Sequence, residues 1–220
     1  MTDLNVDLAR LNMIQSQVRT WDVLDQRITE TLATVARESF VPQHCRNFAF
    51  VDMQIPLGHG QVMMEPKVEG RMLQTLDPRP DEHALEIGTG SGFITACLSK
   101  LAGRVTSVEF YADLQSEAGA RLQAGGFQGI DLVTGDAAAG WDDGVHYDVI
   151  AVTGSLPELH QGFHRSLSIG GRLFVIVGEF PIMEALRVTR VGENAWSTES
   201  LFDTSVPSLE NAYRPARFAL

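Results

Sequence analysis

A glycine-rich run between a strand pattern and a helix pattern restricts the fold of this chain more than any other feature. The run from Leu85 to Phe93 (LEIGTGSGF) ends an apolar stretch with strand character and opens a segment with helical spacing. Glycine lets backbone N–H groups approach a ligand closely, and the N-terminus of the following helix adds partial positive charge. Taken alone, such a run is equally compatible with an ordinary tight turn between a strand and a helix.

Short apolar runs alternate with helical segments from about residue 82 onward, which is the pattern of β-α-β units and a parallel sheet. The predicted strands are 83–87, 104–109, 130–134, 147–152 and 172–177. Helices are expected after Gly92, Ala112 and Pro157. Beyond Pro181 the alternation continues without helical spacing, which predicts antiparallel strands at one sheet edge. The predicted fold class is therefore α/β, a doubly wound, mostly parallel sheet with helices on both faces.

The N-terminal region has a different pattern. Two apolar stripes with helical spacing predict two packed helices: Leu4, Leu8 and Leu11, followed by Ile28, Leu32 and Val35. The stretch 40–66 is rich in proline and glycine and is expected to be mostly loop, with a short extended piece. Loops of this kind often carry binding or catalytic residues.

Composition excludes several classes of protein. Lys plus Arg total 17 against 28 Asp plus Glu, a formal charge of -11, which is the wrong sign for a broad phosphate-binding surface, so nucleic acid is not expected as a partner. Cys45 and Cys97 have no metal-ligand or disulfide spacing, and no metal is expected. The longest apolar stretch, Leu173–Val177, is too short to cross a bilayer, and no secretory signal is evident. A cytoplasmic location is expected.

Charge around the glycine loop points to a particular ligand. The glycine spacing differs from the dinucleotide fingerprint, and Glu86 beside the loop would repel a pyrophosphate but attract an ammonium and a sulfonium. S-adenosylmethionine carries both groups. Glu109, at the end of the next strand, is positioned to accept bonds from ribose hydroxyls, and Asp136, after the third strand, from the adenine amine. The predicted cofactor-binding residues are Glu86, Gly88, Thr89, Gly90, Ser91, Gly92, Glu109, Phe110, Asp136 and Ala137.

Several runs spread over most of the chain carry a more specific resemblance: Arg37–Pro42, Ile55–Gln61, Glu86–Gly92, Tyr147–Ile150 and Gly170–Leu173. With them the chain resembles the protein-L-isoaspartate O-methyltransferase family, within the class I S-adenosylmethionine-dependent methyltransferases. The resemblance implies a Rossmann-like, seven-stranded sheet with a reversed strand at one edge and an N-terminal helical cap over the cofactor. It also implies methylation of the abnormal carboxylate of damaged aspartyl residues in proteins, with S-adenosylhomocysteine as the product.

The resemblance divides the chain into three parts of a single domain. Residues 1–80 are expected to form the helical cap and the acceptor loop, 81–180 the cofactor-binding core, and 181–220 the edge strands. The acceptor side would be bordered by four residues, namely Ile55, Leu57, His59 and Thr153. A protein or peptide substrate is the expected partner, and the chain is expected to be a monomer.

One position departs from the family pattern. Where the family has its active-site serine or threonine hydroxyl, this chain has Met64, and a thioether cannot donate a hydrogen bond. A carboxylate acceptor is already anionic at pH 7, so losing one positioning bond costs about 1 to 3 kcal/mol, or roughly ten- to a hundredfold in rate. Three alternatives stay open: a methyltransferase with another protein acceptor, a small-molecule methyltransferase, and a binding module that has lost catalysis.

Other candidate residues have structural interpretations. His160 and His164 have helical spacing but lack the companion ligands of a metal site, so a surface helix is predicted there. Cys97 is expected in the core, and Asp148 at a strand entrance. Thr153 and Ser155, at the end of the fourth predicted strand, offer hydroxyls that could replace the one missing at Met64.

Overall fold

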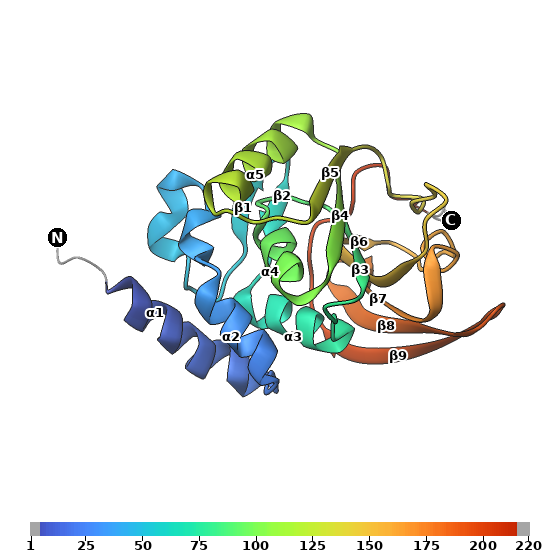
Figure 1. Cartoon of the computed structure of the whole chain (residues 1–220), viewed down its shortest axis with the longest axis horizontal. Helices are drawn as coiled ribbons and strands as arrows, with labels where there is room; N and C mark the ends of the chain where they lie inside the picture. Colours follow the sequence, from blue (N-terminus) through green and yellow to red (C-terminus); the bar gives the residue numbers. More distant parts are fainter. Residues whose placement is uncertain (1–4, 215–220) are drawn as a thin grey trace, which may run out of the picture.

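A computed structural model describes residues 5–214 and shows a seven-stranded sheet with the order β5-β4-β3-β6-β7-β8-β9 (Figure 1). The strands are β3 (His83–Ile87), β4 (Arg104–Glu109), β5 (Ile130–Thr134), β6 (Tyr147–Leu156), β7 (Leu167–Glu179), β8 (Ile182–Gly192) and β9 (Ala195–Asp203). Strands β3 to β7 are parallel, whereas β8 is antiparallel to both of its neighbours. The predicted α/β class, with a mostly parallel seven-stranded sheet, is confirmed, and the reversed strand lies one place in from the edge.

The helices are α1 (Val6–Met13), α2 (Gln26–Thr34), α3 (Pro66–Leu76), α4 (Phe93–Leu101) and α5 (Ala112–Ala124). Shorter turns complete the N-terminal region: the π-helical η1 (Ile14–Val18) and the 3-10 turns η2 (Arg19–Trp21), η3 (Arg37–Ser39) and η4 (Gln43–Phe48). A hairpin of β1 (Ile55–Gly58) and β2 (Gln61–Met63) precedes α3. None of the helices in residues 5–214 is long and apolar enough to cross a membrane.

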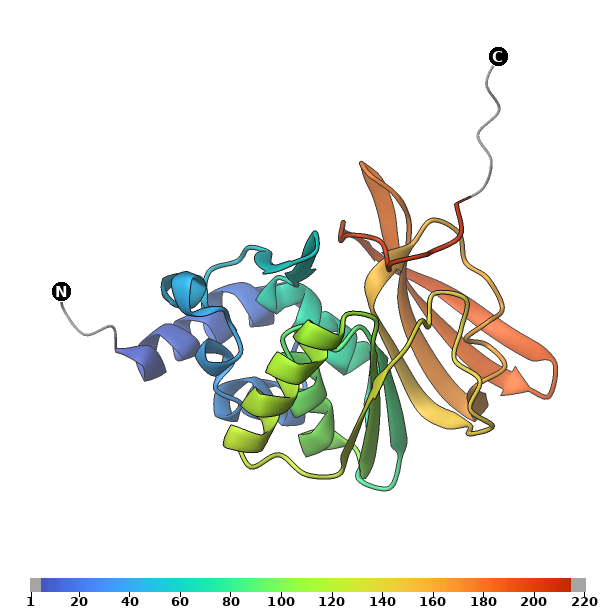
Figure 2. The same ribbon diagram turned by 90° about the horizontal axis from the view of Figure 1, so that it is seen from above.

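The two faces of the sheet are covered differently (Figure 2). Helices α3, α4 and α5 pack on one face. The other face is covered by connecting segments, and Phe163 and Trp141 from two of these pack against Tyr147 and Ile150 of β6. The helix predicted after Pro157 is wrong, because residues 157–166 form bends and turns. Among the described residues, helices therefore cover one face, not both.

Close packing explains why no helix forms in that connection. Gly162 lies against the backbone of Ala139, where a Cβ atom would come within 1.9 Å of the Ala139 carbonyl oxygen. Phe163 and the adjacent His164 are both buried, although adjacent positions on a helix point in different directions. His164 therefore belongs to the core of this face and not to a surface helix.

The N-terminal helices form an outer layer on α3 and α4. The predicted stripe Ile28, Leu32 and Val35 is fully buried in and after α2, as expected. The first stripe is wrong, because Leu8 and Leu11 of α1 are about half exposed (52% and 51%) and Leu4 lies outside the described residues. Helix α1 instead buries its last residue, Met13, and the π-helical turn that follows buries Ile14 and Val18.

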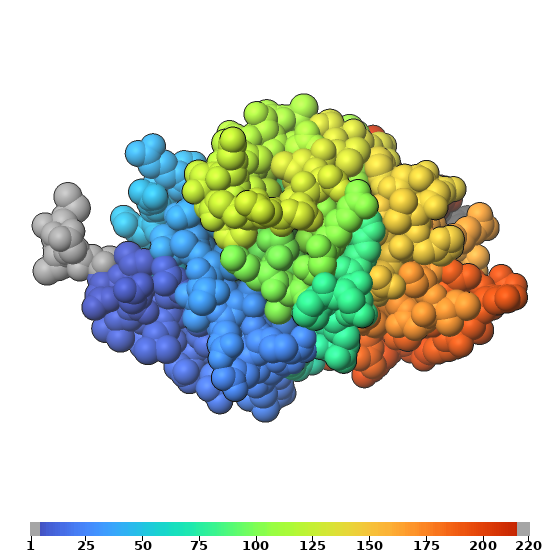
Figure 3. Space-filling model, viewed as in Figure 1, coloured from blue at the N-terminus to red at the C-terminus, as the bar shows by residue number. Residues whose placement is uncertain are grey.

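The space-filling view shows the N-terminal helices at one end of the long axis and the C-terminal strands at the other (Figure 3). Between them lie the carboxyl ends of the parallel strands. In open α/β sheets, ligands bind at that edge. The β1–β2 hairpin reaches it from the N-terminal side, where Leu57 packs against Gly90.

Candidate active site

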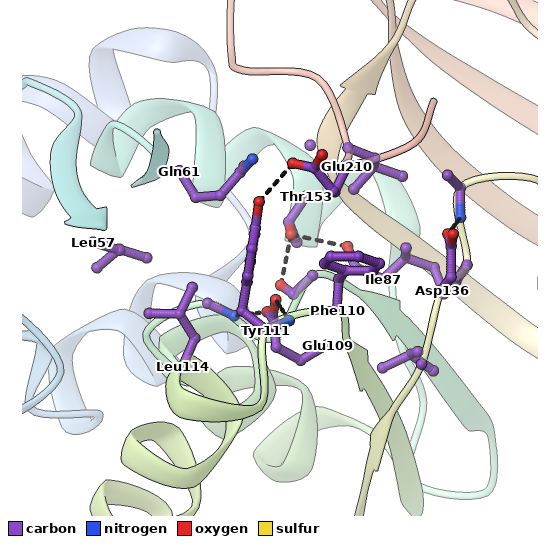
Figure 4. Close-up of a pocket in the computed structure, with 18 of the residues that line it drawn as sticks. Leu57, Gln61, Ile87, Glu109, Phe110, Tyr111, Leu114, Asp136, Thr153 and Glu210 are labelled. Carbon is purple, nitrogen blue, oxygen red and sulfur yellow. Dashed lines mark hydrogen bonds between the residues drawn. The ribbon is translucent and has the colours of Figure 1, made fainter. Parts of the chain in front are cut away.

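Two adjoining cavities lie at the carboxyl ends of β3, β4, β5 and β6. The larger, whose lining residues are shown in Figure 4, encloses about 590 Å³, part of it open to solvent. The smaller lies under the β1–β2 hairpin. Five residues line both cavities, namely Leu57, Val62, Gly88, Gly90 and Thr153. The two cavities therefore share a wall that includes Thr153.

The glycine loop follows β3 and closes onto its neighbours. Gly88, Gly90 and Gly92 all have positive φ (94°, 52° and 87°), which favours glycine. A Cβ atom on Gly88 would lie 2.5 Å from the Thr153 hydroxyl oxygen, so that position also excludes a side chain on steric grounds. Gly90, Thr89 and Ser91 line the cavities, whereas Gly92 caps α4 and packs against Ala118.

Glu86 is fully buried at the wall of the smaller cavity. Its Oε2 accepts hydrogen bonds from Thr95 Oγ1 (2.5 Å) and Ser107 Oγ (2.6 Å), but its Oε1 has no partner among the described residues. Desolvation by burial raises the pKa of this carboxyl to about 8. An orphaned carboxyl oxygen beside a cavity fits the amino group of S-adenosylmethionine.

Glu109 ends β4 and is buried in the wall of the larger cavity. Its Oε2 accepts from the backbone N–H of Gly90 at 2.8 Å, and its Oε1 from that of Tyr111 at 3.0 Å. These bonds fix the carboxylate against the glycine loop, and each oxygen keeps a further lone pair for a ribose hydroxyl. Phe110 follows at the rim with 40% of its surface exposed.

Asp136 lies after β5, opposite Glu109 across the larger cavity (Figure 4). Its Oδ1 accepts from the backbone N–H of Ala138 at 3.0 Å, and its Oδ2 from the side-chain amide of Asn211 at 2.8 Å. Ala137 lines the same wall. The structure thus brings the predicted cofactor residues around the two adjoining cavities, apart from Gly92, which caps α4.

Met64 is buried and lines the smaller cavity, as its place in the sequence predicts. The guanidinium of Arg37 donates to the Met64 carbonyl oxygen (2.8 Å) and to the Ala49 carbonyl oxygen (2.8 Å). Arg37 is fully buried and also forms an ion pair with Glu69. A buried arginine therefore fixes the backbone at Met64 through its carbonyl oxygen.

The other predicted acceptor residues are dispersed. Leu57 and Thr153 line both cavities, but Ile55 is buried in the core and lines neither. The Thr153 hydroxyl donates to the carbonyl oxygens of Ile87 or Gly88 (3.0 and 2.7 Å), and the Ser155 hydroxyl donates to Val206. Both hydroxyls are therefore already used as donors.

His59 occupies the tip of the hairpin and also lines neither cavity. Its ring stacks on Tyr111 with 4.0 Å between centroids, and its Nε2 lies 2.8 Å from Asp113 Oδ2. Two further interpretations agree with the structure. Cys97 is buried in the core, and Asp148 accepts from the His83 backbone N–H at the start of β3.

Sequence reasoning missed several residues of the larger cavity: Gln61, Tyr111, Leu114, Leu209 and Glu210. Tyr111 carries a usable signal, because it is an aromatic residue two positions beyond the strand-end Glu109. Leu209 and Glu210 come from the segment after β9, and no local pattern there indicates a ligand site.

A glycine loop after the first parallel strand, with acids at the ends of that strand and the next two, defines a class I S-adenosylmethionine-dependent methyltransferase. The family model for protein-L-isoaspartate(D-aspartate) O-methyltransferase matches residues 10–204. The chain belongs to this family.

Individual relatives agree with that assignment. Protein-L-isoaspartate O-methyltransferase 1 of Rhodopseudomonas palustris strain HaA2 is 35% identical over 195 residues, covering 88% of this chain and 80% of the relative. Protein-L-isoaspartate O-methyltransferase of Koribacter versatilis strain Ellin345 is 34% identical over 212 residues, which cover 96% of this chain and 95% of the relative. A Plasmodium falciparum protein assigned to the same methyltransferase family, solved with S-adenosyl-L-homocysteine, has the same fold, with a TM-score of 0.78 over 94% of this chain and 99% of that one, at 18% identity.

Proposed function

We propose that this chain transfers a methyl group from S-adenosylmethionine to the free carboxylate of L-isoaspartyl residues in proteins. The methyl bond to the sulfonium breaks, a bond to a carboxylate oxygen forms, and a methyl ester and S-adenosylhomocysteine result. The observation that carries this proposal is the family match, which spans the cofactor loop and the hairpin together. The adjoining cavities support it, because they meet at Leu57 and Thr153.

The residues of the two adjoining cavities suit the cofactor. Glu109 would hold the ribose hydroxyls, Asp136 the adenine amine, and Glu86 the amino group, while the loop around Gly88 and Gly90 lets the ligand approach the backbone. The sulfonium supplies a methyl group that is already activated by its charge. The protein then has to align the acceptor and exclude water, without a strong general base.

Met64 changes how the acceptor is aligned. Because the Met64 thioether cannot donate a hydrogen bond and the Thr153 hydroxyl already donates to backbone carbonyls, neither of these two side chains offers a donor to a carboxylate. Arg37 keeps the Met64 backbone in place through its carbonyl, so the shape of the site persists. We therefore expect slow methyl transfer and not a loss of the activity.

The test is transfer of labelled methyl to an isoaspartyl peptide, with the aspartyl peptide as the reference. Met64→Ser restores the hydroxyl and should raise the rate about ten- to a hundredfold. Met72→Ser places a hydroxyl at a buried position that lines neither cavity and is the control, expected to give no gain. Selective transfer by the unaltered protein supports the proposal. Transfer by Met64→Ser alone means that the natural acceptor is different, and transfer by neither protein contradicts the proposal.

The cytoplasmic location and the monomeric state stay predictions from the sequence.

A further inference from the structure

The segment at 205–211, which we call the cover segment, leaves β9 and crosses the carboxyl ends of the strands. Figure 2 shows this part of the chain, in red, facing the β1–β2 hairpin. Its first half is held firmly, because the Ser155 N–H donates to the Pro207 carbonyl and the Leu209 N–H donates to the Ser155 carbonyl, both at 2.9 Å. Ser155 and Val206 are buried. Backbone pairing with β6 therefore anchors the start of the cover segment.

The second half of the cover segment forms a wall of the larger cavity, to which Leu209 and Glu210 contribute. The Tyr111 hydroxyl donates to Glu210 Oε2 at 2.5 Å across the mouth of this cavity (Figure 4). The Asn211 side-chain amide donates to Asp136 Oδ2 at 2.8 Å on the opposite rim. The cover segment is thus fastened to both sides of the cavity.

Tyr111 is itself fixed in place. Its backbone N–H donates to Glu109 Oε1 at 3.0 Å, and its ring lies flat against the ring of His59, with 9° between the planes. His59 belongs to the hairpin tip and contacts Asp113 at the start of α5. The Tyr111 hydroxyl therefore connects the hairpin, α5 and the cover segment at one point.

The two halves of the cover segment differ in how strongly they are held. The anchored half is joined by backbone bonds around buried residues, whereas Glu210 and Asn211 are exposed and held through their side chains. Hydrogen bonds at exposed positions exchange with water at little cost. The second half can therefore move away from the cavity while the sheet and the anchored half stay folded.

We propose that Glu210 and Asn211 form a gate over the cofactor cavity, and that the contact between Tyr111 and Glu210 sets how fast the cofactor and its product leave. This inference rests on the proposed function, because it takes the larger cavity as the cofactor site. The gate also touches Asp136 through Asn211, at the carboxylate oxygen that an adenine amine would need or share.

The first test measures the dissociation rate of S-adenosyl-L-homocysteine from the full chain. Tyr111→Phe and Glu210→Gln should each raise this rate about three- to tenfold. Both residues line the cavity, so each single substitution could also act directly on the ligand. If both act through their shared contact, the dissociation rate of the double variant should not exceed that of the faster single variant. Tyr213→Phe removes an exposed hydroxyl from the same region and should leave the rate unchanged. Unchanged rates in the single variants, or fully additive effects, would overturn the gate.

The second test uses hydrogen exchange in the protein without ligand and does not depend on the cofactor. The Ala212 amide should exchange faster in Tyr111→Phe than in the unaltered protein or in Tyr213→Phe, because its N–H donates to the Leu209 carbonyl when the gate is closed. The Leu209 amide donates to Ser155 in the anchored half and should keep its exchange rate. Unchanged exchange overturns the gate. If exchange is faster in Tyr111→Phe but the protein does not bind S-adenosyl-L-homocysteine, the contact between Tyr111 and Glu210 holds the gate closed, and the proposed function is refuted.

Discussion

At the scale of single residues, Glu86 has the environment most sensitive to a ligand. It is buried beside the smaller cavity with one oxygen unpartnered, and burial raises its pKa to about 8. The carboxyl therefore holds its proton at neutral pH in the absence of a ligand. A cationic amino group pairs with the carboxylate and not with the neutral acid, so binding must remove that proton.

This gives a prediction on proton release. At pH 6.5 an α-amino group is protonated, because its ordinary pKa is about 7.7 to 8.0. Binding of S-adenosyl-L-homocysteine at this pH should release about one proton, and affinity should rise with pH from 6 toward 8, because below its pKa of about 8 Glu86 must lose a proton to bind the amino group. Calorimetry in buffers of different ionisation enthalpy measures the release. In Glu86→Gln it should vanish, so equal release from both proteins would refute the assignment.

At the scale of elements, a buried ion pair joins the 3-10 turn η3 to helix α3. Arg37, from η3, contacts Glu69 of α3, donates to the carbonyls of Ala49 and Met64, and lies over the Phe93 ring at 4.9 Å. Burial raises the pKa of Glu69, while the adjacent guanidinium opposes that shift. One arginine therefore connects the segment before β1, the end of the hairpin and two helices.

Removing that arginine should be costly. In Arg37→Met, Glu69 is left buried without its partner and two carbonyls lose their donor, so the free energy of unfolding should fall by about 3 to 5 kcal/mol. The double variant with Glu69→Leu should lose less, because the unpaired acid is gone. Arg79→Met, at an exposed ion pair, is the control and should change stability by less than about 1 kcal/mol. Urea unfolding measures all three, and a double variant less stable than Arg37→Met would contradict this account.

The elements also show what the sequence could and could not reveal. The bounds of β3, β4 and β5 match the predicted ranges, because short apolar runs between glycines and helical segments leave few alternatives. Leu159 and Phe163 have helical spacing, which is compatible with the helix expected after Pro157. No helix forms there, because the segment packs into a tight turn around Gly162. Leu8 and Leu11 mimic a buried stripe on α1.

The candidate site follows the same logic. Glu86, Glu109 and Asp136 were predictable because each is tied to a strand end, whose place in a parallel sheet is known. The contact between Tyr111 and Glu210 joins residues 99 positions apart, and no local pattern encodes it.

At the scale of the whole molecule, the face of the sheet that no helix of residues 5–214 covers has a hydrophobic core of its own. Phe163 is fully buried there, in a connection without regular structure. Phe163→Ala should lower the free energy of unfolding by about 3 to 5 kcal/mol, because it leaves a cavity against the sheet. Leu8→Ala, on the half-exposed side of α1, should change it by about 0.5 kcal/mol or less. Thermal or urea unfolding compares the two, and a larger loss for Leu8→Ala would mean that the helical layer, not this face, limits stability.

The cover segment has a consequence for the order in which the protein is made. Synthesis runs from the N-terminus, and a domain generally folds as a unit. The glycine loop and the hairpin belong to the first half of the chain, whereas Glu210 and Asn211 follow the last strand of the sheet. The residues that enclose the larger cavity are therefore made after all seven strands that build it, so the cavity can be closed only at the end of synthesis.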